Sequence, residues 1–360
     1  MENERERLSV DTIIIVTIYL ALLTIGYFNL SSAVIYSRYT SLPDTQLMWI
    51  VMGLIVSFLT IRIMSNIHHG NLVIPGVVTV YALLVLVLFF GENWGGSTRW
   101  FSTPIGGIQP SELSKPIIVL VFSSLYSLMK NYKIANLAVL FISLTVAALI
   151  MLEPDLGTAM VFMFMFFVYY LVSEKRVLRI IELLTVVVIV ALIGFFFILQ
   201  PYQRERITSF LNPESNPATY YQTKQSITMI ASGGLEGKGY QRGLGNLYGY
   251  IPADHTDFIL AVYGEEWGFF GMCLFLGLWL ILFITLLRLI YLKRGIKRWV
   301  TLGVFSVFFF QFCVNTAMVA GLIPVTGLPL PFFTYGGSSM LTNSAMIGMI
   351  LWSSLREKNI

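Results

Sequence analysis

Residues 72–90 read Leu-Val-Ile-Pro-Gly-Val-Val-Thr-Val-Tyr-Ala-Leu-Leu-Val-Leu-Val-Leu-Phe-Phe, from Leu72 to Phe90, without one charged side chain. A helix needs about 20 mostly apolar residues to cross the hydrocarbon core of a bilayer. The stretch therefore predicts a membrane-spanning helix. Similar stretches recur on both sides of it.

The composition of the whole chain agrees with a membrane protein. Of its 360 residues, 56% are hydrophobic and 12% are charged, and the mean hydropathy is +0.77. Soluble domains carry about 25% charged residues, so a soluble enzyme of this composition would lack the polar surface to cover itself. The high hydrophobicity also excludes a disordered chain.

Ten such stretches predict an all-α polytopic membrane protein, with residues 1–360 forming a single membrane domain. The predicted spans are 12–30, 46–64, 72–90, 111–129, 134–151, 156–172, 178–199, 258–290, 299–320 and 338–354. A tight turn separates the fifth span from the sixth, and the eighth is long enough to begin with a non-spanning turn. A large extracytoplasmic loop, residues 200–257, lies between helices 7 and 8.

The basic residues predict the orientation. Fifteen of the 23 Lys and Arg residues fall on the side of the N-terminus, whereas the short loops of the other side hold only Arg38 and Arg99. Because basic loops stay in the cytoplasm, both termini are expected there. The first span is too long for a cleavable signal peptide.

The net charge of +4 predicts no nucleic-acid surface. The two cysteines, Cys273 and Cys313, are interpreted as small buried hydrophobic residues.

Four polar segments then share the outer face: 91–110, 152–157, 200–257 and 321–337. Their common side predicts one composite site. Segment 200–257 carries six tyrosines and seven glycines, a composition that suits contact with a sugar. The alternative is that interfacial tyrosines anchor a re-entrant loop.

The stretch from Ser232 to Gly239 resembles a nucleotide-binding phosphate loop but lacks its first glycine and its final Ser or Thr. A glycine-rich backbone with Lys238 can still hold a phosphate group.

Asp257 is the last polar residue before the apolar run that begins at Phe258, and it follows His255 and Thr256. A carboxylate at the membrane boundary is partly desolvated and is a candidate general base. The alternative is that Asp257 or Thr256 caps the helix. Glu265 and Glu266 lie within the same span, and charges at such depth are usually functional or paired.

Three further features complete the polar set. Arg99 is a candidate partner for a phosphate, while Glu112 and Lys115, three residues apart, can pair with each other. Segment 321–337 is too rich in Pro and Gly for a helix, and irregular backbone at membrane depth must be buried in protein or line a wet cavity. Its end, Tyr335 to Ser338, opens the tenth span, where free N–H groups can hold an anion.

These motifs, in this order, resemble the signatures of the SEDS family (shape, elongation, division and sporulation), which includes RodA, FtsW and SpoVE. The resemblance covers essentially the whole chain, and the short tails are more like RodA than FtsW. The matching motifs are Arg99-Trp100, Gln109-Pro110-Ser111-Glu112 with Lys115, Glu153 to Thr158, Tyr221 to Gly239, His255-Thr256-Asp257-Phe258, and Pro324 to Ser339.

The resemblance implies a peptidoglycan glycosyltransferase of the bacterial cytoplasmic membrane that polymerises lipid II into glycan strands for cell elongation. It also implies a class B penicillin-binding protein as a partner transpeptidase, and it matches the family's catalytic aspartate to Asp257. Substrate contacts are expected at Arg99, Trp100, Glu112, Lys115, Lys238, His255, Thr256, Tyr335 and Ser338. Arg99 and Lys115, with loop amides or a divalent cation, would stabilise the departing polyprenyl-linked pyrophosphate.

Three alternatives remain open at the level of sequence. One is a transporter that flips lipid II, although its polar path would have to cross the bilayer rather than gather at one face. Another is a scaffold that only recruits a penicillin-binding protein. The third is a polymerase that serves division, as FtsW does, rather than elongation.

Overall fold

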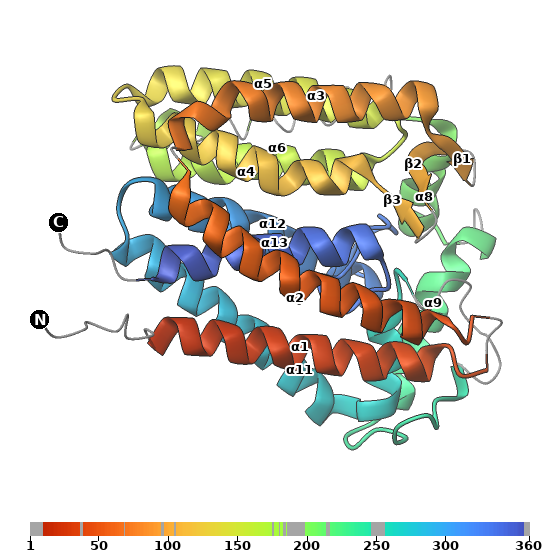
Figure 1. Ribbon diagram of the computed structural model, residues 1–360. Coiled ribbons are helices and arrows are strands. Elements are labelled where there is room, and N and C mark those ends of the chain that lie inside the picture. The colour runs from red at the N-terminus through yellow and green to blue at the C-terminus, as the bar shows by residue number, and fades with distance from the viewer. Residues whose placement is uncertain are drawn as a thin grey trace, which may run out of the picture.

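The computed structural model is a bundle of long helices with a small sheet and two shorter helices at one end (Figure 1). It describes residues 10–36, 39–67, 69–94, 97–103, 106–174, 176–179, 181–182, 185, 199–213, 217–245 and 256–355. The long helices are α1 (Val10–Ala33), α2 (Leu42–Asn66), α3 (Val73–Phe90), α4 (Pro110–Leu128), α5 (Tyr132–Leu152), α6 (Leu156–Ser173), α11 (Ile259–Leu292), α12 (Gly295–Val319) and α13 (Gly337–Ser354). The 3-10 helix η1 (His69–Leu72) leads into α3.

Nine of the ten predicted spans coincide with these helices. The seventh, 178–199, falls mostly outside the described residues, so the count of ten stays a prediction. Among the described residues, seven helices are long and apolar enough to cross a membrane. The remaining two long helices, α4 and α13, are more polar. They can carry polar side chains because most of their residues are buried against other helices rather than exposed to lipid.

The end of the bundle drawn on the right in Figure 1 carries an antiparallel sheet in the order β1-β2-β3. Its strands are β1 (Glu92–Trp94), β2 (Ser97–Thr103) and β3 (Gly106–Ile108), with Phe101 opposite Ile108. The sheet corrects the all-α expectation for segment 91–110. Strands this short carry no clear alternation, and they form here because β2 packs on α3 and α4 while β3 packs on α13. We call this the sheet end and the opposite one the terminal end.

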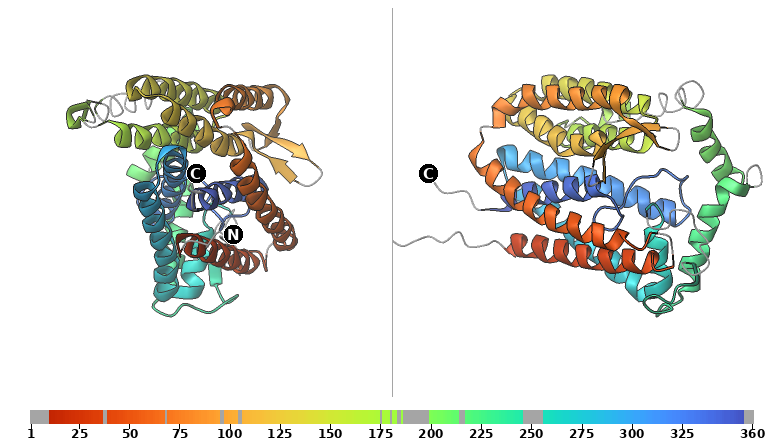
Figure 2. Two further views of the ribbon diagram at one scale, coloured as in Figure 1. Left: turned by 60° about the vertical axis from the view of Figure 1, so that its left-hand side comes forward. Right: turned by 45° about the vertical axis from the view of Figure 1, so that its right-hand side comes forward.

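Two more helices, α8 (Pro201–Leu211) and α9 (Pro217–Ser232), cross the sheet end (Figure 2). Each begins at a proline, whose fixed φ suits the first turn of a helix. In α8 the Gln200 N–H donates to Gln203 Oε1 over 3.0 Å and closes the first turn. The large loop thus contains ordered helices, and α9 packs against α11 and α12.

The terminal end gathers the start of α1 and the end of α13, where the Thr12 and Ser354 hydroxyls lie 2.7 Å apart. Ten of the fifteen basic residues predicted for this side are described here: Arg62, Lys130, Lys133, Arg176, Arg179, Arg288, Lys293, Arg294, Lys297 and Arg298. Lys293 and Lys297 donate to the carbonyls of Ser354 and Leu355 and so satisfy the last carbonyls of α13.

Helix α11 is broken at Gly268, which has φ 60° and ψ −159°. The break removes two helical hydrogen bonds, and the chain after α9, residues 233–245, replaces them from both sides. Phe269 N–H and Phe270 N–H donate to the carbonyls of Gly234 and Leu235, while Lys238 N–H and Gly239 N–H donate to those of Glu265 and Glu266. We call residues 233–245 the strap.

The prediction that both cysteines are buried is wrong for Cys273, which is exposed, while Cys313 is half-buried. Cys273 lies on an outward face of α11, next to exposed Leu274 and close to Phe270. In a membrane protein such a face is apolar as well, so hydropathy does not separate it from the core.

Gly337, the first residue of α13, allows Trp49 of α2 to lie directly against the helix start. A Cβ on Gly337 would overlap the Trp49 indole. We predict that Gly337→Ala lowers the free energy of unfolding by about 1–3 kcal/mol through overpacking, measured by thermal unfolding in detergent. Gly277→Ala in α11 is the control, because its Cβ would meet nothing within 4 Å. Equal behaviour of the two variants would contradict this account.

Candidate functional site

Arg99, on β2, holds the turn between α5 and α6. Its Nε donates to the Glu153 carbonyl over 2.6 Å and its Nη2 donates to the Pro154 carbonyl. Nη1 lies 4.0 Å from Asp155 Oδ2, and the side chain remains 25% exposed. The structure thus places Arg99, the predicted phosphate partner, against the α5–α6 turn with its side chain partly exposed.

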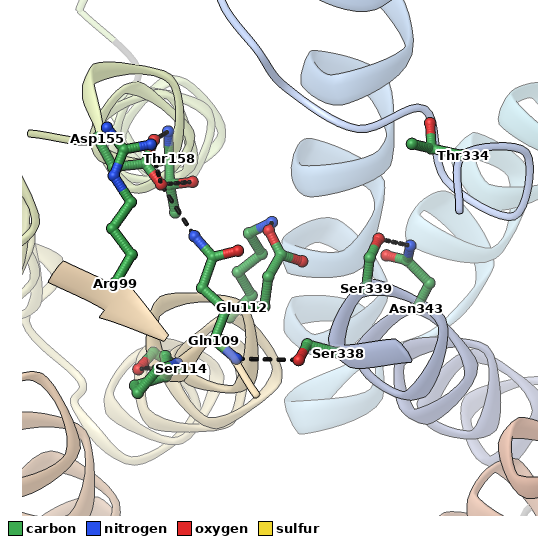
Figure 3. A network of polar contacts seen from close by, with 12 residues as sticks. Arg99, Gln109, Glu112, Ser114, Asp155, Thr158, Thr334, Ser338, Ser339 and Asn343 are labelled. Carbon is green, nitrogen blue, oxygen red and sulfur yellow. Dashed lines mark hydrogen bonds and ion pairs between the residues drawn. The ribbon is translucent and has the colours of Figure 1, made fainter. Parts of the chain in front are cut away.

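Asp155 and Gln109 connect this turn to the start of α13 (Figure 3). Asp155 caps α6 by accepting from the Thr158 N–H and hydroxyl, each over 3.0 Å. Gln109 Nε2 donates to Asp155 Oδ2 over 3.0 Å, and the Gln109 N–H donates to Ser338 Oγ over 2.9 Å. Ser338 in turn donates to the Gly107 carbonyl over 3.3 Å. Two of the four predicted polar segments, 91–110 and 152–157, therefore meet here at the start of α13.

Glu112 and Lys115 form a buried ion pair on α4, with side-chain exposures of 3% and 0%. Lys115 Nζ donates to Glu112 Oε1. Glu112 Oε2 and Ser111 Oγ are buried without a partner among the described residues. Figure 3 shows Glu112 between the Asp155 group and the Ser339–Asn343 pair of α13. Desolvated polar atoms left without partners inside a bundle are costly, so Glu112 Oε2 and Ser111 Oγ are candidate contacts for a polar ligand group.

Asp257 is the last residue of segment 200–257, lies just before α11 and contacts segment 321–337. Asp257 Oδ2 is 3.6 Å from the position that a Cβ on Gly327 would occupy. Asn315 of α12 fixes the backbones of both segments: its Nδ2 donates to the carbonyl of Asp257 over 3.2 Å and to that of Leu328 over 2.9 Å. The Asp257 side chain is half-buried, as the boundary position predicts.

The segment between α12 and α13 is held as a fixed irregular backbone. Phe332 adopts φ 66°, a left-handed conformation that non-glycine residues rarely take. Its ring packs edge-on against Tyr19 and Phe308, which compensates for the strained backbone. The Leu330 N–H donates to Thr334 Oγ1 over 2.8 Å. Tyr335 is half-buried and lies two residues before the start of α13.

One interpretation of the sequence was that Lys238 holds a phosphate group within a glycine-rich loop. In the structure Lys238 instead pairs with a glutamate of α11. Its Nζ lies 2.6 Å from Glu265 Oε1, in an ion pair whose carboxylate is buried. Glu265 also accepts from the N–H groups of Leu244 and Gly245 over 3.0 and 3.1 Å. Glu266 accepts from Ser32 Oγ of α1 over 2.5 Å and from the backbone N–H groups of Gln241 and Gly243 in the strap. The two glutamates within the span therefore fasten the strap to α11.

The remaining predicted residues are distributed as follows. Trp100 lies on β2 with its ring against Gly107 of β3, where a Cβ would approach the ring to 3.0 Å. Thr256 is half-buried beside Asp257. His255 lies outside the described residues. Within the part of the chain that is described, no group of three or more His, Cys, Asp or Glu side chains could hold a metal ion.

Sequence reasoning missed Glu153 as an individual site residue. Its side chain is fully buried, and both carboxylate oxygens lack a hydrogen-bond partner among the described residues. Burial raises the pKa of Glu153 to about 8; the Asp155 carboxylate adds to the rise and the Arg99 guanidinium opposes it. A glutamate directly after an apolar span and before Pro-Asp was the available signal.

Because the pKa of Glu153 is raised, the free energy of unfolding decreases as the pH rises. Below about pH 4.5 both states are protonated; between about 4.5 and 8 only the unfolded chain ionises, so the fold loses up to about 1.4 kcal/mol per pH unit. Glu153→Gln should remove this contribution, measured as the thermal unfolding midpoint from pH 5 to pH 8. The exposed Glu236→Gln is the control. An unchanged pH slope in Glu153→Gln would contradict the assignment.

The fold and this polar end define a multi-pass membrane protein whose site is built between helices at one bundle end. Residues 9–359 match the family model described as cell cycle protein, which comprises FtsW, RodA and SpoVE. The chain therefore belongs to the SEDS family, as the motifs predicted.

Curated relatives carry the same family names. The chain is 34% identical over 304 residues to the putative peptidoglycan glycosyltransferase FtsW of Mesostigma viride, covering 82% of this chain and 71% of that protein. It is 32% identical over 314 residues to the peptidoglycan glycosyltransferase MrdB of Escherichia coli K12, covering 84% and 82%.

Solved structures share the fold. One chain from a study described as the structural coordination of polymerization and crosslinking by a peptidoglycan synthase complex aligns with a TM-score of 0.81 and 30% identity, covering 94% of this chain and 96% of that one. The rod shape determining protein RodA of Thermus thermophilus aligns with a TM-score of 0.69 and 27% identity, covering 94% and 95%.

Proposed function

We propose that this protein is a peptidoglycan glycosyltransferase that polymerises lipid II at the outer face of the cytoplasmic membrane. Its relatives are named peptidoglycan glycosyltransferases. The observation that carries the proposal is the position of Asp257, at the start of α11 and against the Gly327 backbone. Since the basic residues gather at the terminal end, we assign that end and both termini to the cytoplasm.

In this proposal Asp257 is the general base. The acceptor is the 4-hydroxyl of the incoming N-acetylglucosamine, and the donor is the growing strand, still linked through pyrophosphate to its polyprenyl chain. Asp257 takes the hydroxyl proton as the oxygen attacks the anomeric carbon, whose configuration inverts. The hydrogen bonds from Asn315 to the carbonyls of Asp257 and Leu328 hold the base and its facing segment in one geometry.

The departing pyrophosphate is assigned to Arg99 and to the polar interior beside it. A guanidinium offers five N–H groups, and Arg99 uses Nε and Nη2 on the α5–α6 turn. Glu112 and Lys115, together with the start of α13 at Ser338, form the inner wall of the same region. Tyr335, Trp100 and Thr256 are assigned contacts with the sugars, whereas Lys238 contributes by holding the strap.

The partner is proposed by analogy with the synthase complex, whose description joins polymerization to crosslinking. We assign the crosslinking role to a class B penicillin-binding protein. The proposed setting is cell elongation rather than division, by analogy with the rod shape determining protein RodA, whose structure shares this fold. The whole chain, residues 1–360, acts as one membrane domain.

Asp257→Asn should strongly reduce polymerisation. Loss of a general base slows a reaction by about 10²–10⁴-fold, and we expect a loss in this range for glycan synthesis from lipid II by the purified protein with its partner. Asp44→Asn, an exposed carboxylate in the first turn of α2 at the sheet end, is the matched control and should retain activity. Wild-type polymerisation by Asp257→Asn would exclude the role. Lipid II transport without polymerisation by the unmodified protein would favour the transporter.

Arg99→Ala should weaken polymerisation by about 10²-fold, the cost of losing one donor to developing negative charge. Because Arg99 also supports the α5–α6 turn, thermal unfolding is measured alongside. Arg99→Lys keeps the charge and should recover part of the activity. Full turnover by Arg99→Ala, or a loss of activity that only follows loss of folded protein, would remove the pyrophosphate role.

A further inference from the structure

A groove of about 440 Å³ opens at the terminal end, opposite the site described above. It is lined by Ser65, Asn66, Ile67, Gly70, Asn71, Ser124, Ser127, Leu128 and Ile296. These residues come from the end of α2, from Ile67 and η1, from the end of α4 and from the start of α12. The proposed polymerase reaction makes no use of this groove.

The lining is polar without carrying charge. Five of its nine residues are Ser or Asn. Ser65 Oγ donates to the Ile61 carbonyl over 2.8 Å and Asn66 Nδ2 donates to the Arg62 carbonyl over 3.0 Å. The Ser65 oxygen can still accept a hydrogen bond, and the Asn66 amide keeps a second N–H to donate. Such a surface suits a ligand rich in oxygen atoms, such as a glycerol phosphate.

Three basic residues lie within four positions of lining residues in the sequence, and none of the lining residues carries a carboxylate. Arg62 stands one helical turn before Asn66 on the same face of α2. Lys130 follows Leu128 by two residues, and Arg294 precedes Ile296 by two. All three side chains are exposed. The edge of the groove therefore favours an anion, while its neutral lining offers hydrogen bonds.

Exposed apolar side chains continue from the groove toward the membrane-spanning part of the bundle. Ile63 on α2, Ile74 on α3 and Leu128 on α4 are 52%, 75% and 59% exposed. Among the candidate spans that the structure describes, α2 and Gly70–Phe90 have the smallest share of buried residues. A ligand with a polar head and apolar tails would therefore match both surfaces.

We propose that this groove binds the headgroup of an anionic phospholipid, with the phosphate near Arg62, Lys130 and Arg294 and the acyl chains along α2 and α3. Basic pockets between spanning helices on the cytoplasmic side are suited to lipid phosphates. The volume is sufficient for a headgroup with its glycerol. This site is independent of the polymerase reaction and would exist even if that assignment failed.

The test uses the purified full-length protein in a neutral detergent. Bound lipid is measured by native mass spectrometry, and the thermal unfolding midpoint is measured during titration with phosphatidylglycerol, phosphatidylcholine or inorganic phosphate. We expect retention of phosphatidylglycerol and a rise in the midpoint with that lipid alone. The double variant Arg62→Gln/Lys130→Gln should bind it about tenfold more weakly.

Two further variants sharpen the test. Ser127→Phe, at an exposed lining position, should fill the groove and abolish binding while leaving the lipid-free unfolding midpoint unchanged. Arg176→Gln removes an exposed positive charge beyond α6 at the same end and should bind as the unmodified protein does. Equal binding of phosphatidylcholine, equal stabilisation by inorganic phosphate, undiminished binding by Ser127→Phe, or an equal loss in Arg176→Gln would each overturn the proposal.

Discussion

Within a bilayer every backbone N–H and C=O must find a partner inside the protein, and the break in α11 shows how the rest of the structure depends on that constraint. At Gly268 the regular hydrogen bonding of one helical segment ends, and a second helical segment begins after it. The strap supplies two acceptors and two donors to the groups that the break leaves open. Glu265 and Glu266 then fix the strap itself, so the short helix that follows Asp257 has a defined orientation.

The same constraint explains why the polar chemistry lies inside the bundle. Glu112 and Lys115 are buried as a pair on α4, and α13 presents Ser338, Ser339 and Asn343 to the interior. A lone charge in this position would be strongly destabilising, whereas a pair with hydrogen bonds is tolerated. The two long helices with the weakest apolar signal, α4 and α13, are therefore the ones that carry these buried polar side chains.

The sequence predicted the fold because long apolar runs translate directly into spans, and nine of those ranges coincide with helices. It also predicted that the four polar segments share one end. It did not predict the sheet at 92–108, since pairing of such short strands depends on α4 and α13. It left the partner of Lys238 open, because Glu265 lies 27 residues further on and only tertiary packing brings them together. Glu153 escaped notice as an individual site residue for the same reason: burial is not visible in a motif.

The hydrogen bond between the Gln109 N–H and Ser338 Oγ joins residues 229 positions apart. A small sheet needs a buried apolar face or a helix to pack against, and β3 rests on the last helix of the chain. Biosynthesis therefore has an order: the first helices can enter the membrane as they emerge, but the polar end cannot take shape until α13 has been made. A nascent chain that stops before residue 337 holds most of the membrane domain and none of the completed site.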